Sequence, residues 1–133
     1  METQDLAQFY FNQADAFMVA INSVEVVVDI NKKACEILGY SKEEVVGKNW
    51  FDSFLSPRIK EDTRRLFHDM LGGALRHVHY EHPVITKTGE ERVFDFHNIL
   101  ISDQKGNTIG TLSSGADVTE RRLKEKSLKK MEN

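Results

Sequence analysis

An alternating run of histidines, His77-Val78-His79-Tyr80-Glu81-His82, holds the side chains best suited to metal chemistry in this sequence. Alternate residues of a β-strand share one face, which would place His77, His79 and Glu81 together. His97 could approach them from the following strand. Neutral imidazoles and a carboxylate could bind zinc. Alternation on a half-buried strand also produces this spacing without any metal, so we expect a polar outer face and predict no metal site.

The other polar residues do not form a catalytic pattern. We find no nucleophile with a matched base, no glycine-rich phosphate loop and no metal-catalytic motif. Asp29, Glu81 and Asp95 are separate strand residues with ordinary surface explanations. Cys35 is the only cysteine, which excludes an internal disulfide and a cysteine-rich metal site, and its place on a short helix indicates a small core residue. We therefore predict that this chain is not an enzyme.

Composition limits the partners of the chain. With 133 residues, 40% hydrophobic and 29% charged, the sequence indicates one globular domain. Its formal net charge of -3 gives no basic footprint for nucleic acid. No apolar run approaches the roughly 20 residues of a membrane span, and the N-terminus lacks the order of a signal peptide. We expect a cytoplasmic domain whose parent could still be anchored in a membrane.

The first half of the chain predicts a hairpin followed by short helices. An amphipathic helix at 5–13 precedes strands at 17–21 and 24–30. Asn31 would cap a helix at 32–38, and Gly39 would end it. Ser41 and Glu44 form a capping box for a second, very short helix. A connector at 49–56 carries large apolar rings. Period-two alternation in the second strand would place on one face Val24, Val26, Val28 and Ile30.

The second half predicts one long helix and three strands. Pro57 begins the helix and Gly72-Gly73 end it. Its apolar face comprises Ile59, Thr63, Leu66, Phe67 and Met70. Strands at 76–86, 92–102 and 108–116 are joined by short turns and form an antiparallel meander. Helices inserted between the second and third strands would cover one face of the sheet. This order predicts an α+β domain with a cavity-prone space between helices and sheet.

Several short motifs, taken in this order, resemble the PAS family of sensor domains. They are Asp29-Ile30-Asn31, Leu38-Gly39-Tyr40-Ser41, Gly47-Lys48, Thr88-Gly89, Asp103…Gly106…Ile109-Gly110 and Asp117-Val118-Thr119-Glu120-Arg121-Arg122. The resemblance implies a five-stranded antiparallel sheet with helices on one face. It divides the chain into a flanking helix at 1–14, a sensory domain at 15–119 and the start of a signalling helix at 120–133. It does not imply a ligand, because PAS domains share a fold and differ in what they hold.

The cofactor-binding branches of the family fit this sequence poorly. The light-oxygen-voltage branch uses the cysteine of a Gly-x-Asn-Cys motif for its flavin photoadduct, and here that position is Trp50. Gly115 replaces the glutamine of the last strand. Haem-binding relatives place a histidine on the long helix, where His68 lies about 150° from the middle of the apolar face. We expect a surface histidine there, with a haem ligand as the alternative, and predict no cofactor.

The family alignment suggests a pocket between the sheet and the helices. It directs Phe94, Phe96 and Asn98 toward the helices, and strand pairing would add Tyr80 and His82. The polar members either bond to each other and to the helix backbone, or they orient a small polar or aromatic ligand. The candidate pocket residues are Trp50, Tyr80, His82, Phe94, Phe96 and Asn98.

The resemblance implies a sensory input module of a larger signalling protein. Relatives with this ending commonly control a diguanylate cyclase or a histidine kinase through the exit helix. The relay would use Asp117, Thr119 and Arg121, with the aspartate paired to a basic side chain and the threonine capping the helix. The alternative is a ligand-free dimerisation or interaction module. We expect a homodimer through the flanking helices, although Leu123 is out of register with Leu128 and Met131.

Overall fold

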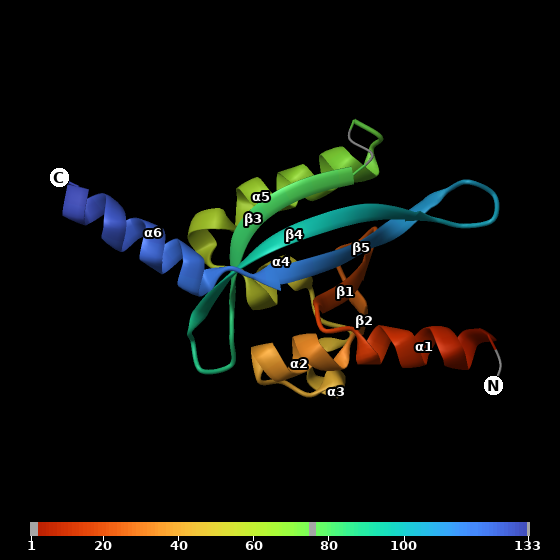
Figure 1. Ribbon diagram of the computed structural model, residues 1–133. Helices are drawn as coiled ribbons and strands as arrows, with labels where there is room; N and C mark the ends of the chain where they lie inside the picture. Colours follow the sequence, from red (N-terminus) through yellow and green to blue (C-terminus); the bar gives the residue numbers. More distant parts are fainter. Residues whose placement is uncertain (1–2, 75–76, 133) are drawn as a thin grey trace.

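The computed structural model describes residues 3–74 and 77–132, which form a single antiparallel sheet with helices against it. The strands are β1 (Phe17–Asn22), β2 (Val27–Ile30), β3 (His77–Ile85), β4 (Glu91–Ser102) and β5 (Thr108–Asp117). Their spatial order is β2-β1-β5-β4-β3. The last strand in the sequence therefore lies at the centre of the sheet, between β1 and β4 (Figure 1).

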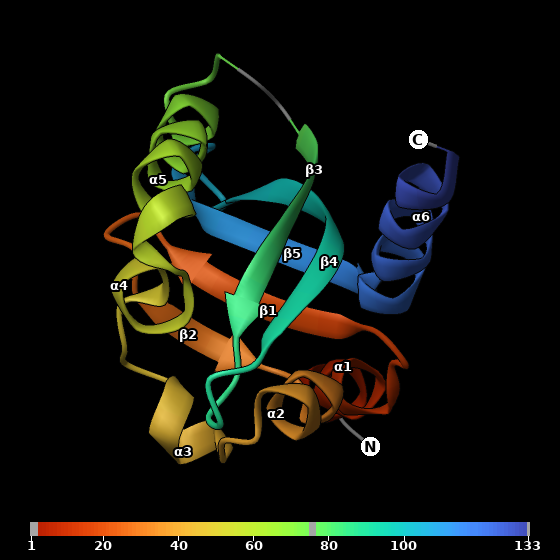
Figure 2. The same cartoon turned by 90° about the vertical axis from the view of Figure 1, so that its left-hand side faces the viewer.

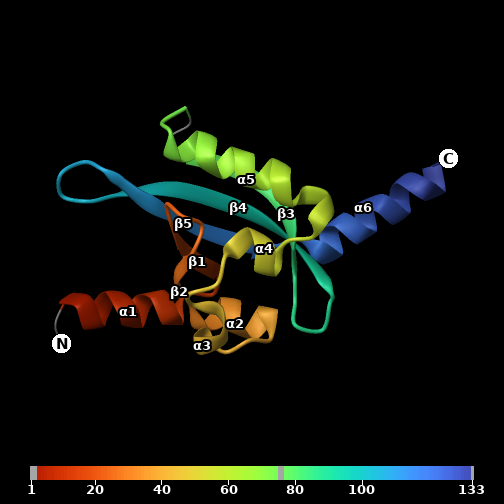
Figure 3. The same ribbon diagram turned by 180° about the vertical axis from the view of Figure 1, so that it is seen from behind.

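Four helices lie between β2 and β3 in the sequence and cover one face of the sheet (Figure 3). They are α2 (Lys32–Leu38), α3 (Lys42–Val45), α4 (Trp50–Phe54) and α5 (Pro57–Leu71). The terminal helices α1 (Thr3–Gln13) and α6 (Thr119–Glu132) point away from the domain in opposite directions. Figure 2 shows α6 on the side of the sheet away from α4 and α5. In the part of the chain that the structure describes, no helix is both long enough and apolar enough to cross a membrane.

The predicted caps of α2 and α3 are present. Asn31 Oδ1 accepts the Ala34 N–H, and Gly39 ends α2 in the left-handed conformation at φ 82°. Ser41 and Glu44 form the reciprocal capping box of α3. The predicted connector after α3 contains a helix of its own, because Asn49 caps α4 through the Asp52 N–H. This helix is too short to have shown a period in the sequence.

The predicted face of the second strand was wrong. Val24 and Val28 are exposed, whereas Val27 is fully buried. Glu25 turns the chain with φ 72°, so regular pairing begins only at Val27. The register then shifts against β1, and the resulting bulge breaks the alternation at Val28. A pattern of valines alone could not reveal that extra residue.

Aromatic side chains from the helices and the sheet form the core. Phe17 of β1 lies at its centre, with ring centroids 4.8 Å from Phe94, 5.7 Å from Phe96 and 6.1 Å from Trp50. From α5, Phe67 packs against the ring of Phe51. As predicted, α5 turns its apolar face inward, and on that face Thr63, Phe67 and Met70 are buried.

Candidate functional site

A small cavity lies between the inner face of the sheet and the helices α4 and α5. Its volume is about 40 Å³. That space accommodates a few water molecules, whereas pockets for drug-sized ligands measure roughly 300–1,000 Å³. Of the candidate pocket residues, those that line the cavity are Trp50, Tyr80, His82, Phe96 and Asn98. Phe94 instead is fully buried in the core against Phe17.

The cavity has three polar lining residues that sequence reasoning missed, Thr63, Thr111 and Ser113. Thr63 belongs to the apolar face of α5, where the sequence pattern indicates packing and not a polar role. Thr111 and Ser113 belong to β5, whose small residues give no clear burial pattern. Their inward positions follow from strand pairing, because Ser113 lies opposite Asn98 of β4.

The polar groups of the cavity bond to near neighbours. Asn98 Nδ2 donates to the Val78 carbonyl at 3.2 Å, and Ser113 Oγ donates to Asn98 Oδ1. His82 Nδ1 lies 3.1 Å from the Pro83 carbonyl, which can only accept, so Nδ1 carries the proton. Burial lowers the pKa of His82 to about 4. The ring is therefore neutral at pH 7, and Nε2 is its acceptor.

Charge is absent from the cavity wall. Among the described residues that line it there is no carboxylate, ammonium or guanidinium group. An ion placed there would lose its hydration without gaining a counter-charge. The wall combines aromatic rings with a few hydroxyl, amide and imidazole groups. It is suited to an uncharged molecule that carries one or two hydrogen-bonding atoms.

An ionic cluster ties α5 to Glu25, next to two rings that line the cavity: Arg64 lies over Phe51, and His68 packs against Phe67. Glu25 accepts hydrogen bonds from Arg64 Nε at 3.0 Å and from His68 Nε2 at 2.6 Å, both on α5. It also accepts from Asn49, and Arg64 reaches Asp52. Burial alone would raise the pKa of the Glu25 carboxyl, but its hydrogen bonds with His68, Asn49 and Arg64 outweigh burial and lower that pKa. We call this set the Glu25 cluster.

The junction of β5 and α6 is tied to the start of β4. Arg92 donates to Asp117 Oδ2 from Nε at 3.0 Å and from Nη2 at 2.8 Å. Asp117 Oδ1 accepts the backbone N–H and the hydroxyl of Thr119. Thr119 Oγ1 in turn accepts the Val93 N–H at 2.8 Å. The carboxylate, rather than the predicted threonine, thus satisfies a free N–H at the helix start.

Charge supports this junction. Burial alone would raise the pKa of Asp117, but the hydrogen bonds from Thr119 and Arg92 outweigh it and keep the pKa below its usual range. A second contact holds the first turn of α6 to β3. Arg122 Nε donates to Glu81 Oε1 at 2.9 Å, while the predicted Arg121 reaches the same carboxylate only at 3.4 Å. Sequence reasoning missed Arg122 and Glu81, because the rotation of α6 decides which arginine faces the sheet.

The described geometry is that of a sheet with a helix-covered inner cavity and an exit helix anchored at two strands. The profile of the PAS domain matches residues 14–120. The chain belongs to the PAS family. No curated protein matches it.

Solved structures confirm the PAS-like α+β fold. The PAS domain of a protein from Colwellia psychrerythraea matches with a TM-score of 0.80 at 18% identity, over 90% of this chain and 99% of that one. An RNA-binding light-oxygen-voltage receptor matches with a TM-score of 0.82 at 16% identity, over 97% of this chain and 37% of the receptor. The RpfR quorum-sensing receptor PAS domain from Cronobacter turicensis, in complex with BDSF, gives 0.69 at 25% identity, over 80% and 97%.

Three positions of this PAS domain bear on cofactors. The indole of Trp50 is buried and packs against Phe54, with centroids 5.1 Å apart. A Cβ on Gly115 would lie only 2.7 Å from the ring of Phe96, so aromatic side chains occupy the space beside this residue. His68 is exposed and belongs to the Glu25 cluster. The predicted surface position of His68 is confirmed.

Proposed function

We propose that this PAS domain is a sensory input module whose inner cavity binds a small, uncharged and largely apolar molecule. The observation that carries the proposal is the convergence of His82, Asn98 and Ser113 on a cavity that is lined mainly by apolar side chains and, among the described residues, carries no charged one. Neutral His82 offers a hydrogen-bond acceptor, and the Asn98 amide offers both a donor and an acceptor. Of the solved relatives, the RpfR PAS domain was captured in complexes with BDSF and with C12:0.

The cavity must enlarge before it accepts an organic ligand. The wall formed by α5 can move more easily than the wall formed by the sheet, because the strands are held by continuous pairing. The hydrogen bonds of Arg64 and His68 with Glu25 oppose that movement. We therefore assign opening to an outward shift of α5 that breaks the Glu25 cluster. The energy of ligand contacts would have to offset the loss of these ion pairs, in which the Glu25 carboxylate is largely buried.

The output runs through the sheet to α6. The pocket residues Tyr80 and His82 belong to β3, which also carries Glu81 on its other face. Glu81 holds Arg122 and Arg121, and Asp117 and Thr119 hold the helix start. A shift of β3 or β4 would change the rotation or the order of α6. In the parent protein we propose a cytoplasmic effector after this helix, such as a diguanylate cyclase or a histidine kinase.

Dimerisation is part of the same proposal. The apolar residues of α1 that we expect at a dimer contact, Leu6, Phe9 and Tyr10, are exposed. On α6, Leu123, Leu128 and Met131 are exposed as well. A homodimer through these flanking helices would bury both sets. The same exposure favours a second candidate function, a dimerisation module that uses no ligand.

A pair of serine substitutions tests the pocket. Ser113→Val adds bulk to the cavity wall, and we expect it to weaken binding of any neutral compound found in a thermal-shift screen by about tenfold or more. Ser114→Val is the matched control, because the next residue of the same strand faces the other side of the sheet. Calorimetric titration of both variants measures the effect. Equal affinity in the two variants would contradict the pocket assignment, and an unchanged output in the parent would favour the dimerisation module.

A substitution at the exit junction tests the relay. We expect Asp117→Ala to cost about 1–2 kcal/mol of stability, leaving the domain folded, because Arg92 keeps access to water. The first turn of α6 should fray, with faster amide hydrogen exchange at residues 119–123. In the parent protein the output should lose its dependence on the input. Asp103→Ala, in a turn distant from α6, is the control. An output that still responds to the input would rule out this junction as the relay.

A further inference from the structure

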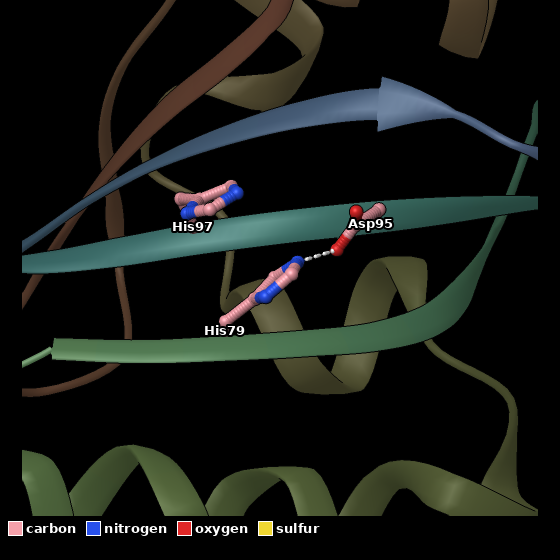
Figure 4. Close-up of side chains that lie close together, drawn as sticks. All are labelled: His79, Asp95 and His97. Atoms are coloured by element: carbon pink, nitrogen blue, oxygen red, sulfur yellow. Dashed lines mark ion pairs between the residues drawn. The ribbon is translucent and has the colours of Figure 1, made fainter.

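We propose that His79, Asp95 and His97 form a binding site for a divalent transition-metal ion of the zinc type. The three side chains lie on the outer face of β3 and β4, away from the inner cavity (Figure 4). One ligand atom from each of the three lies within 4.8 Å of the others. The proposal is independent of the pocket, since it concerns the opposite face of the sheet.

Strand pairing fixes the positions of the three ligands. His79 and His97 are direct partners across β3 and β4, and Asp95 lies two residues before His97 on the same face. The two imidazoles stack with centroids 4.1 Å apart and an angle of 16° between their planes. Two atoms bound to one zinc ion, each at about 2.0–2.2 Å, lie at most roughly 4 Å apart. Small side-chain rotations therefore suffice to bring all three onto one ion.

Asp95 carries a buried carboxylate oxygen without a hydrogen bond among the described residues, which the sequence could not show. Its Oδ1 is shielded from solvent and accepts no well-directed hydrogen bond from the residues that the structure describes. Its neighbour is His79 Nε2, with which it forms an ion pair when that imidazole is protonated. Buried carboxylate oxygens are normally satisfied. A metal ion between Asp95 and His79 would satisfy this oxygen and would use the neutral form of the imidazole.

The surroundings leave room for the remaining ligands of an ion. On β5, Ala116 lies beside Asp95 and Ser114 lies beside His97, so small side chains flank the site. Water could fill the open coordination positions, as it does at three-ligand zinc sites. Glu81, the carboxylate first suspected from the sequence, is engaged by Arg122 instead. The side chain of His77 lies outside the described residues.

The donor set selects the class of metal. Two imidazole nitrogens and one carboxylate suit zinc, nickel or copper, whereas calcium and magnesium prefer sites made only of oxygen ligands. The 2+ charge of a divalent ion would exceed the 1− charge of the Asp95 carboxylate, so the occupied site would carry a net positive charge. Asp95 is the strand partner of Glu81, so a bound ion would join β3 to β4 next to the carboxylate that holds α6.

Titration of the untagged 133-residue chain with Zn²⁺ tests the site. We expect one ion per chain, and a weakening of about tenfold or more in each of His79→Gln, Asp95→Asn and His97→Gln. His68→Gln, which removes an exposed imidazole on α5, should bind Zn²⁺ as tightly as the unsubstituted chain does. Zn²⁺ should raise the melting temperature of the unsubstituted 133-residue chain and of His68→Gln, but not of the three site variants. Mg²⁺ in excess should not compete.

Two outcomes would overturn the proposal. One is Zn²⁺ binding of the same strength in the parent chain and in His79→Gln and His97→Gln. The other is an equal loss of binding in His68→Gln, which would indicate dispersed surface histidines. Melting temperatures measured in a chelator separate these outcomes from misfolding. His79 and His97 are exposed, so their substitution should shift melting only slightly, whereas Asp95 is half-buried and its substitution should lower the melting temperature more.

Discussion

Asn31→Asp is expected to lower the free energy of unfolding by about 3 kcal/mol or more, although it only replaces the side-chain NH₂ group with an oxygen. The Asn31 side chain is completely buried and uses both ends of its amide. Oδ1 accepts the N–H groups of Met18 and Ala34. Nδ2 donates to the carbonyls of Phe11 and Ala16. A carboxylate would keep the two accepted bonds and turn the other two into repulsive oxygen–oxygen contacts.

The same substitution at Asn22 provides the control. Asn22 Oδ1 accepts the N–H groups of Val24 and Val26, and aspartate can accept both in the same way. Asn22→Asp should therefore change stability by less than about 0.5 kcal/mol. Urea unfolding of the two variants measures the difference. Similar stability losses at both positions would contradict the role given to the donors of Asn31.

The deficit of Asn31→Asp should shrink in acid. Burial raises the pKa of the introduced carboxyl above its value in the unfolded chain. As the pH falls through that raised pKa, the folded state takes up a proton before the unfolded state does, which stabilises it relative to neutral pH. The protonated group can also donate to one of the two carbonyls. Comparison with the parent chain at pH 7 and pH 5 isolates this effect from other titrations.

Gly110→Ala is expected to cost more than about 3 kcal/mol, and it could prevent the sheet from closing. Gly110 lies in β5 opposite Asn22 of β1 and Ile101 of β4. A Cβ at this position would lie 2.1 Å from the carbonyl oxygen of Ile21 and 3.0 Å from the Cα of Asn22. Both obstacles are backbone atoms, so no side-chain rotation relieves the clash. β1 and β5 would have to separate.

Gly72→Ala is the matched control for this substitution. Gly72 ends α5 with φ -76°, which alanine adopts freely, and the nearest atom to a new Cβ would be the His68 carbonyl oxygen at 3.4 Å. The expected change is within about 1 kcal/mol in either direction. Thermal unfolding of the two variants compares them directly. A Gly110→Ala variant as stable as Gly72→Ala would show that β1 and β5 approach less closely than described.

Helix-capping residues and other short sequence motifs predicted much of the fold. Asn31, Gly39 and the pair Ser41 and Glu44 act on backbone groups within four residues of themselves, so their roles could be predicted without the tertiary structure. The same asparagine also bonds to Phe11 and Ala16, far back in the chain. No local pattern indicates those two bonds. They depend on where α1 ends relative to β1.

Much of the candidate site was predicted from the family alignment together with strand pairing. The alignment directed Asn98 inward, pairing across the hairpin added Tyr80 and His82, and all three line the cavity. Ser113 was missed because a small polar residue gives no signal of burial. The partners of α6 and of the outer histidines were missed for another reason. Arg122 rather than Arg121, and Asp95 rather than Glu81, are selected by helix rotation and strand register, which are tertiary properties.

The central position of β5 has a consequence for how this domain is made. Strands β1 and β2 are synthesised early, yet β1 finds its second neighbour only when β5 is available. Until then β1 and β4 both have open edges, which are liable to pair with other chains. On the ribosome the sheet cannot close before residue 117 has left the exit tunnel. Pairing across so much of the sequence also slows folding, because the loop must close before the contacts form. The newly made chain therefore keeps these strand edges unpaired until nearly all of it has been synthesised.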